Sequence, residues 1–381
     1  MKKYFLAVAS FFIYSHISLG QVYPGQMDST FVPVRSHHYD PELTFDFCVN
    51  EPAWSNQAGI HSAFGSTDRL YFRKEVPVNH DNDLSSSYST TVWRGERANA
   101  QILVWSSEAL EQVRVSTQDL RSAEGNIIPK DRITFELVRY VLSNYPYAEK
   151  KAICGESPYK SGFLMPDRFE TLDRFDLPSQ TTRPVWMMVD VPRGTAPGTY
   201  KGQVEVRAKG KAPQLLNLEI VVQNQLLPYP KDWKYRLDLW QNPWAVAWYN
   251  HVEPWSPEHK MLLKQHLKHY ADAGGTYITT YGVHSPWSDN SYMIEGGMIE
   301  WIKKADGTWA FDYKIFDEYV ELAMECGIDE AITLYTPIPW GFRHRYKDEA
   351  TGDYSYINWT PSSKEFKKMW NIFLTDFKFH L

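Results

Sequence analysis

The pattern of secondary-structure signals in the chain changes near residue 230. Up to that point it consists of short strands separated by turns, and beyond it strands alternate with helices. The segment LLPYPKDW, Leu226 to Trp233, separates the two patterns and carries two prolines, as domain boundaries often do. With 381 residues the chain also exceeds the usual size of a single domain. We therefore expect a multi-domain protein, with one domain over residues 21–230 and another over residues 231–381.

The first domain is expected to be an antiparallel β-sandwich. Its candidate strands are rich in β-branched and aromatic residues, and turns such as RGTAPGTYKG separate them. The candidates are LTFDFCV, RLYFRKEV, YSTTVWRG, ANAQILVW, EQVRVST, ITFELVRYVL, PVWMMVDVP, TYKGQVEVRAKG and LLNLEIVVQN. No convincing amphipathic helix appears among them, which favours a sandwich. The stretch from Asn144 to Pro184 is expected to be an irregular excursion.

Three helices are expected in the second half, each with signals for its ends. Ser256 is a candidate N-cap for the first helix, and Gly274 follows its end. The second helix is expected to start near Asp312 and to end before Gly327, and the third to start at Ser363. The apolar stripes are Leu263, Leu267, Tyr270 and Ala271; Ile315, Phe316, Tyr319, Val320, Leu322 and Ala323; and Phe366, Met369, Trp370, Phe373, Leu374 and Phe377.

These helices alternate with three candidate strands, which are Tyr235–Gln241, Tyr277–Gly282 and Ala331–Pro337. A hairpin with the turn Asp306–Gly307 is also expected before the second helix. The order βαβαβα favours a parallel sheet, and we expect the first three βα units of an incomplete (β/α)8 TIM barrel. The last helix reaches Leu381 without a cap, so we expect the chain to be a truncated copy of a longer domain.

Residues 1–20 have the three parts of a secretory signal peptide. Lys2 and Lys3 precede a short apolar run, and small residues follow it. The run is too short to span a bilayer, so the protein is expected to be exported to the periplasm or the extracellular space and not to span the membrane.

Composition and motifs exclude several classes of function. The net charge of −6 and the lack of a basic run give no electrostatic footprint for nucleic acid. No phosphate-binding glycine motif follows a strand, and no cofactor is expected. The group His251, Glu253 and His259 matches no standard metal site, so no metal is expected. Three cysteines, Cys48, Cys154 and Cys326, do not form a disulfide framework.

The second half resembles the catalytic domain of glycoside hydrolase family 123. The resemblance lies in RLDLWQNPWAVAWYNHVEPWSPEHKMLL, GGTYITTYGVHSPW, DGTWAFDYKIFDEYVELAMECGI and ITLYTPIPWGFRHRYKDEATGDY. The first half, with GERANAQILVWSS and PVWMMVDVPRGTAPGTYKGQVEV, resembles the β-sandwich that precedes that domain. This resemblance implies an exported exo-β-N-acetylgalactosaminidase, whose partner is a glycan with a terminal N-acetylhexosamine.

The resemblance also implies substrate-assisted retention, in which the 2-acetamido oxygen of the sugar attacks the anomeric carbon. An adjacent Asp-Glu pair then supplies the general acid and orients the acetamido group. In the family this pair lies at the end of the strand after the third helix, and is therefore expected beyond Leu381. The fragment 1–381 is accordingly expected to be inactive.

The pair Asp329–Glu330 imitates such a catalytic pair. It lies between the end of the second helix, at Gly327, and the start of the third strand, at Ala331. Chemistry in a barrel takes place at the C-terminal ends of the strands, whereas this position is at the N-terminal end. We therefore expect Asp329 and Glu330 to have no catalytic role.

Residues at the C-terminal strand ends and in the loops that follow are candidates for the wall of a sugar pocket. Aromatic rings can stack on sugar C–H faces, and Asp, Asn and His can bond hydroxyl groups. The candidates are Asp238, Trp240, Asn242, Tyr281, His284, Trp287, Tyr335 and Trp340. Core packing is the alternative for the strand aromatics, and a structural polar contact is the alternative for Asp238. A non-catalytic carbohydrate-binding protein or an envelope protein is the alternative reading of the whole chain.

Overall fold

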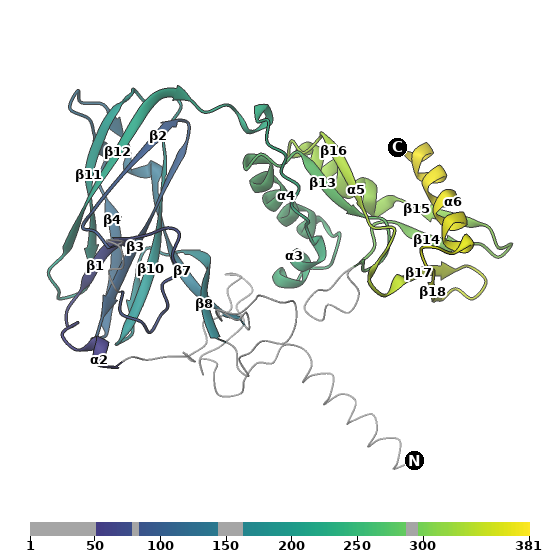
Figure 1. Ribbon diagram of the computed structural model, residues 1–381, viewed down its shortest axis with the longest axis horizontal. Helices are drawn as coiled ribbons and strands as arrows, with labels where there is room; N and C mark the ends of the chain where they lie inside the picture. The colour runs from purple at the N-terminus through teal and green to yellow at the C-terminus, as the bar shows by residue number, and fades with distance from the viewer. Residues whose placement is uncertain (1–50, 78–83, 144–162, 287–295) are drawn as a thin grey trace, which may run out of the picture. The chain divides into compact units, whose positions relative to one another are not determined.

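The computed structural model describes residues 51–77, 84–143, 163–286 and 296–381, and its ribbon is drawn in Figure 1. Within these residues one compact unit ends at Leu227 and another begins at Pro228. The expected signal peptide and the strand LTFDFCV lie outside the described residues.

The first unit is a sandwich of two sheets. One sheet has the order β1-β3-β10-β7-β8 and the other β2-β12-β11-β4-β9, with β5 and β6 added beside β11. The strands are β1 (His61–Gly65), β2 (Ser87–Arg94), β3 (Arg97–Ser106), β4 (Leu110–Thr117), β5 (Leu120–Arg121), β6 (Ile127–Ile128), β7 (Ile133–Ser143), β8 (Phe163–Thr171), β9 (Phe175–Leu177), β10 (Thr181–Asp190), β11 (Gly198–Arg207) and β12 (Gln214–Leu226). Two short helical segments, α2 (Glu51–Trp54) and η1 (Lys130–Arg132), accompany them.

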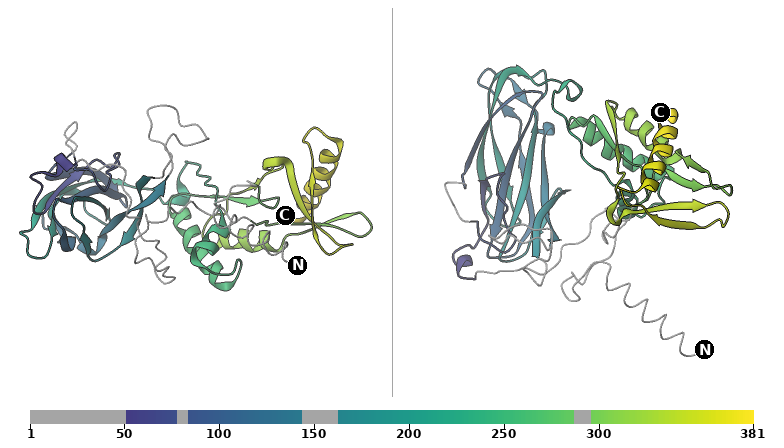
Figure 2. Two further views of the ribbon diagram at one scale, coloured as in Figure 1. Left: turned by 90° about the horizontal axis from the view of Figure 1, so that it is seen from below. Right: turned by 45° about the vertical axis from the view of Figure 1, so that its right-hand side comes forward.

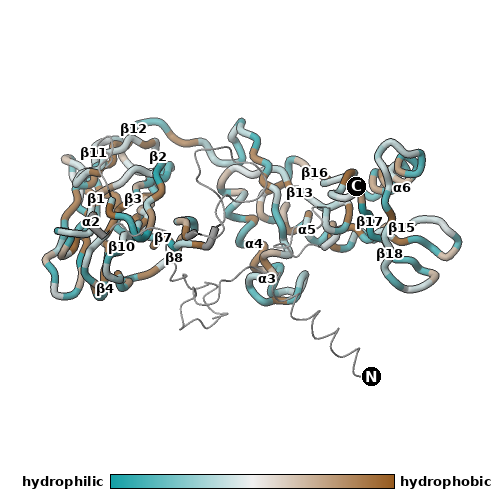
Figure 3. Tube along the Cα trace, turned by 60° about the horizontal axis from the view of Figure 1, so that its bottom comes forward, coloured by the Kyte–Doolittle hydropathy of each residue, from teal (hydrophilic) through white to brown (hydrophobic). Residues whose placement is uncertain are grey.

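The core of the sandwich lies between the sheets. Apolar and polar residues alternate along its strands, which Figure 3 shows as alternating brown and teal, because successive side chains point to opposite faces. Along β12, for example, Leu216, Leu218, Ile220 and Val222 are buried. The pairs are antiparallel as expected, with one exception: β2 runs parallel to β12, with Tyr88 opposite Leu218.

Two sequence expectations for this unit are wrong. The run RLYFRKEV, at residues 69–76, is a loop and not a strand. Its backbone is held by other contacts, since Arg73 accepts a bond from the backbone N–H of Thr182 at 2.8 Å. The stretch before Pro184, where described, is not irregular, because it contains β8, β9 and the start of β10. Pro166 lies in β8, an edge strand, where a missing backbone N–H is tolerated.

The second unit alternates helices and strands. Its elements are η2 (Pro230–Asp232), α3 (Pro243–Asn250), α4 (Pro257–Asp272), β13 (Tyr277–Tyr281), β14 (Glu300–Lys303), β15 (Trp309–Asp312), α5 (Lys314–Glu325), β16 (Ala331–Tyr335), η3 (Trp340–Phe342), β17 (Arg343–Asp348), β18 (Tyr354–Asn358) and α6 (Lys364–His380). The three expected helices are α4, α5 and α6. Ser256 and Ser363 cap α4 and α6, accepting bonds from the backbone N–H of His259 at 3.2 Å and Phe366 at 3.1 Å.

The described residues do not form the three βα units of a TIM barrel that we expected. β13 and β16 form a two-stranded parallel sheet, with Tyr277 opposite Ala331 and Tyr281 opposite Tyr335. The expected first strand, Tyr235–Gln241, is reduced to a single parallel bridge from Leu237 to Gly275. After Asn242 the chain enters α3, a helix that was not expected from the sequence.

A four-stranded sheet, β15-β14-β17-β18, joins the loops that follow the two parallel strands. In the chain, the β14–β15 hairpin lies between β13 and α5, and the β17–β18 hairpin between β16 and α6. Figure 2 draws this part of the chain, in green to yellow, from two further directions. β14 and β17 pair in parallel through Ile302 with Lys347. One face of this sheet packs on α6 around Trp301, whose ring stacks on that of Phe373 at 4.8 Å. Residues 341–353 are thus largely β17 and a turn.

Candidate functional site at the carboxyl ends of the parallel strands

Asp238 joins the two parallel strands. Its Oδ1 accepts a hydrogen bond from the Thr279 hydroxyl of β13, and its Oδ2 accepts one from the Thr333 hydroxyl of β16, both at 2.9 Å. Thr279 is fully buried, whereas Asp238 is exposed. The carboxylate therefore has a structural role and still has lone pairs open to a ligand hydroxyl. The two threonines were not among the sequence candidates, although each occupies the third position of its strand.

Two aromatic candidates, Trp240 and Trp340, are exposed, and a third, Tyr335, is half-buried. The rings of Trp240 and Tyr335 lie 4.7 Å apart at an angle of 45°. Trp240 is 57% exposed and Trp340 is 59% exposed, which is unusual for such large apolar rings. The backbone of Trp340 is fixed by a bond to the Pro286 carbonyl at 3.0 Å, in the loop after β13. Exposed, positioned rings of this kind can stack on the C–H face of a sugar.

The contacts of Tyr281 and Asn242 in the described structure hold the fold together. Tyr281 is fully buried, and its hydroxyl donates to the Gln241 carbonyl at 2.6 Å. Its ring stacks on Trp244 at 5.4 Å, which makes it part of the core. Asn242 Oδ1 accepts a bond from the backbone N–H of Ala245 at 3.3 Å, at the start of α3. These two candidates do not join the exposed rings.

His284, in the loop after β13, is half-buried and close to the backbone of another loop residue. A Cβ added to Gly297 would lie 3.3 Å from its Cα and 3.5 Å from its Nδ1. That Nδ1 is buried and has no hydrogen-bond partner among the described residues. Burial lowers the pKa of His284 to about 4, and the charge of Arg345 acts in the same direction. The imidazole is therefore neutral near pH 7 and able to bond an uncharged ligand.

Arg345, on strand β17 of the four-stranded sheet, lies close enough to His284 for its charge to act on the imidazole. Its guanidinium lies over the Tyr354 ring at 4.1 Å and within 3.7 Å of Glu300. The Tyr354 hydroxyl donates to Glu300 at 2.9 Å. Glu300 and Arg345 line a cavity of about 350 Å³ that also borders Trp255 and α5. The alternating run RHRYK in the sequence could have predicted a strand here, because a two-residue period places Arg343 and Arg345 on one face.

Glu330 lies at the opposite end of the strands. It accepts bonds from the Thr276 hydroxyl at 2.8 Å and the Tyr277 hydroxyl at 3.1 Å, next to the start of β13. These hydroxyls hold the pKa of the Glu330 carboxyl below its ordinary value. Glu330 is thus an ionised, exposed group at the amino ends of the strands, and it is not suited to act as a general acid.

The remaining candidates concern metals, membranes and positions outside the described residues. His259 is held by two backbone groups, accepting from Trp255 N–H and donating to the Pro243 carbonyl, both at 2.8 Å. Among the described residues no group of three His, Cys, Asp or Glu side chains is placed to hold a metal ion. In the same part of the chain we find no helix with the length and apolarity to cross a membrane. Trp287, Cys48 and Cys154 lie outside the described residues, and Cys326 is a buried free thiol.

Comparison with known proteins identifies both halves of the chain. Residues 240–381 match the model of the glycoside hydrolase 123 catalytic domain, and residues 64–208 match that of the glycoside hydrolase 123 N-terminal domain. A search of curated proteins finds no match.

Among solved structures, the chain is similar to a family 123 glycoside hydrolase from Clostridium perfringens, described in terms of glycolipid glycan hydrolysis. The two are 26% identical with a TM-score of 0.74, and the match covers 85% of this chain and 56% of that one. A PapD-like domain of human CEP192 also matches, at 12% identity over 49% of this chain and 99% of that domain, but its TM-score is only 0.23. The chain thus spans just over half the length of the Clostridium enzyme. Two domain models and this solved structure agree, and the chain belongs to glycoside hydrolase family 123.

Proposed function

We propose that the whole protein is an exo-β-N-acetylgalactosaminidase and that residues 228–381 supply part of its sugar-binding wall. The observation that carries this proposal is the ring pair of exposed Trp240 and half-buried Tyr335, together with the exposed Trp340 after β16 and the Asp238 carboxylate that bonds β13 and β16. Rings of this exposure suit the apolar face of a hexosamine, and a carboxylate held between two strands suits its hydroxyls. Neutral His284 adds an uncharged hydrogen-bonding group at the same strand ends.

The proposed chemistry is retention by substrate-assisted catalysis. The acetamido oxygen attacks the anomeric carbon as the glycosidic bond breaks, and a carboxylic acid gives its proton to the leaving oxygen. A second carboxylate accepts a hydrogen bond from the acetamido N–H and stabilises the positive charge that develops on the acetamido group. Water then opens the cyclic intermediate and restores the acetamido group with net retention.

Residues 51–77, 84–143, 163–286 and 296–381 do not present two neighbouring carboxyl groups for these roles at the strand ends. Asp238 is engaged by Thr279 and Thr333, and Asp329–Glu330 lies at the other end. We therefore propose that residues 1–381 bind the sugar without hydrolysing it. Loss of a general acid alone lowers a rate by about 10²–10⁴-fold.

We also propose that the protein acts outside the cytoplasm. The basic and apolar pattern of residues 1–20 supports this proposal, since it has the form of a cleaved export signal. N-terminal sequencing of the secreted or periplasmic protein tests it, and a mature chain that retains Met1 would contradict it.

The enzymatic proposal is tested with the full-length protein and a chromogenic β-N-acetylgalactosaminide. We expect release by the full-length protein, no release by residues 1–381, and at least tenfold weaker sugar binding in both after Trp240→Ala. Trp233→Ala, at the start of the second unit, serves as a tryptophan control. Absence of release by the full-length protein at every pH would refute the enzyme and favour a carbohydrate-binding protein, which the same exposed rings support.

A further inference from the structure

The lateral edge of the sandwich is only partly closed. β8 leaves β7 where Thr171 pairs with Glu136, and after a turn at residues 172–174 the chain joins β4 where Phe175 pairs with Val113. In the described structure, no strand covers residues 114–117 of β4 or residues 133–135 of β7 on that side. Both uncovered segments lie at the same end of the sandwich. This follows because β4 runs away from the turn at residues 172–174, whereas β7 runs towards it.

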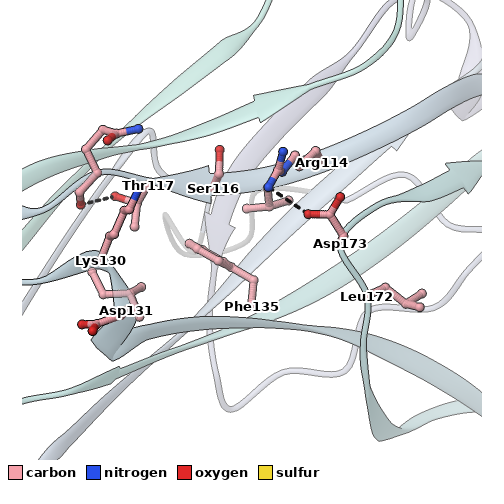
Figure 4. A pocket seen from close by; sticks show the side chains of 11 residues that line it. Arg114, Ser116, Thr117, Lys130, Asp131, Phe135, Leu172 and Asp173 are labelled. Atoms are coloured by element: carbon pink, nitrogen blue, oxygen red, sulfur yellow. Dashed lines mark hydrogen bonds and ion pairs between the residues drawn. The ribbon is translucent and has the colours of Figure 1, made fainter.

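A cavity of about 500 Å³ occupies this opening. Its apolar part consists of Val115 from β4, Ile133 and Phe135 from β7, and Leu172 from the turn. Val115 and Phe135 pack against the core yet are only half-buried, and Figure 4 shows the Phe135 ring projecting into the space. The volume lies in the range of small-ligand sites, and a phenyl ring within polar surroundings is a common feature of such sites.

The rim of the cavity is polar and balanced in charge. The Arg114 guanidinium and the Asp173 carboxylate lie 2.8 Å apart and are 58% and 65% exposed, as drawn in Figure 4. Lys130 and Asp131 stand on the other side. The Lys130 backbone is fixed by a bond from its N–H to Asp119 at 3.0 Å. Two cations and two anions disfavour a strongly charged ligand, and an exposed ion pair rearranges at little cost.

We propose that this cavity is a second saccharide site, which binds an uncharged sugar residue. The sugar places its C–H face on Phe135, while Arg114 donates to its hydroxyls and Asp173 accepts from them. The choice of a saccharide rests on the proposed action of the protein on glycans. An extended peptide that adds a strand is the competing occupant, but the uncovered segments span only four and three residues, shorter than most strands.

The test is a titration of residues 1–381 and of the full-length protein with N-acetylgalactosamine and with diacetylchitobiose, followed by saturation-transfer NMR and calorimetry. Trp240→Ala is the background, because it weakens the site in the second unit. Phe135→Ala removes the ring, and Asp173→Lys removes the hydroxyl acceptor without disturbing the core. Phe169→Ala is the matched control, since Phe169 is exposed on neighbouring β8 and its ring lies 5.6 Å from that of Trp186, tilted by 30°.

We expect saturable binding that both cavity variants weaken by about tenfold or more and that Phe169→Ala leaves unchanged. Binding that Asp173→Lys and Phe135→Ala leave intact would overturn the proposal, as would no sugar binding in the Trp240→Ala background. Displacement of the sugar by an unstructured peptide at lower concentration would assign the cavity to strand addition instead. Hydrolysis by the full-length protein is read separately, so a failed enzyme test with a working cavity remains distinguishable from the reverse.

Discussion

Replacement of Asp238 tests whether this carboxylate stabilises the parallel strand pair. Asp238→Ala removes two charge-assisted hydrogen bonds, from Thr279 and Thr333, and leaves the fully buried Thr279 hydroxyl without its acceptor. Such bonds contribute about 1.5–3 kcal/mol each when buried, and exposure of Asp238 places them at the lower end or below. We therefore expect the free energy of unfolding of the second unit to fall by about 2–3 kcal/mol in total.

The assay is urea unfolding followed by tryptophan fluorescence, with Thr333→Val as the partner in a double-mutant cycle. Thr333→Val alone is expected to cost about 1 kcal/mol, because it removes one of the two bonds. In the double variant that cost should largely disappear, which corresponds to a coupling energy of about 1 kcal/mol. If Asp238→Ala unfolds at the same urea concentration as the parent, or if the two substitutions are additive, the carboxylate does not join the strands.

Two further predictions concern His284 and Ser363. Because burial lowers the pKa of His284 to about 4 from an ordinary 6.5, its contribution to stability is complete above pH 6.5 and is lost as the pH falls toward 4, by about 3 kcal/mol in all. His284→Gln should flatten that part of the pH dependence, and an NMR titration with a midpoint near 6.5 would contradict it. Ser363→Ala removes the cap of α6 and should cost about 1 kcal/mol, whereas Ser363→Asp should preserve stability in the same unfolding assay.

Helices α4, α5 and α6 were predictable because their signals are local. A serine that bonds the N–H three residues on and a glycine with a positive φ act within a few residues, as Ser256 and Gly274 do in α4. The same locality explains the missed β8. Pro166 argues against a strand in isolation, but it is compatible with an edge, and whether a strand lies at an edge depends on partners distant in sequence.

The roles of the site candidates depended on such distant partners as well. Trp240 and Tyr281 are both aromatics near strand ends, yet one is 57% exposed and the other fully buried. The difference arises from Trp244 on α3, which covers Tyr281, and from a carbonyl that accepts its hydroxyl. Asp238 likewise acquires its structural role only because β13 and β16 place threonines on either side of it.

Because β14 pairs with β17, the β14–β15 and β17–β18 hairpins cannot change in length independently of each other. Residues 300–312 follow β13 and residues 343–358 follow β16, but they share one sheet and one set of aromatic contacts with α6. An insertion in the first hairpin would shift the second and, with it, Arg345 and Tyr354. Relatives that differ in length at one hairpin should therefore carry a compensating difference at the other, so that the pair evolves as a single module.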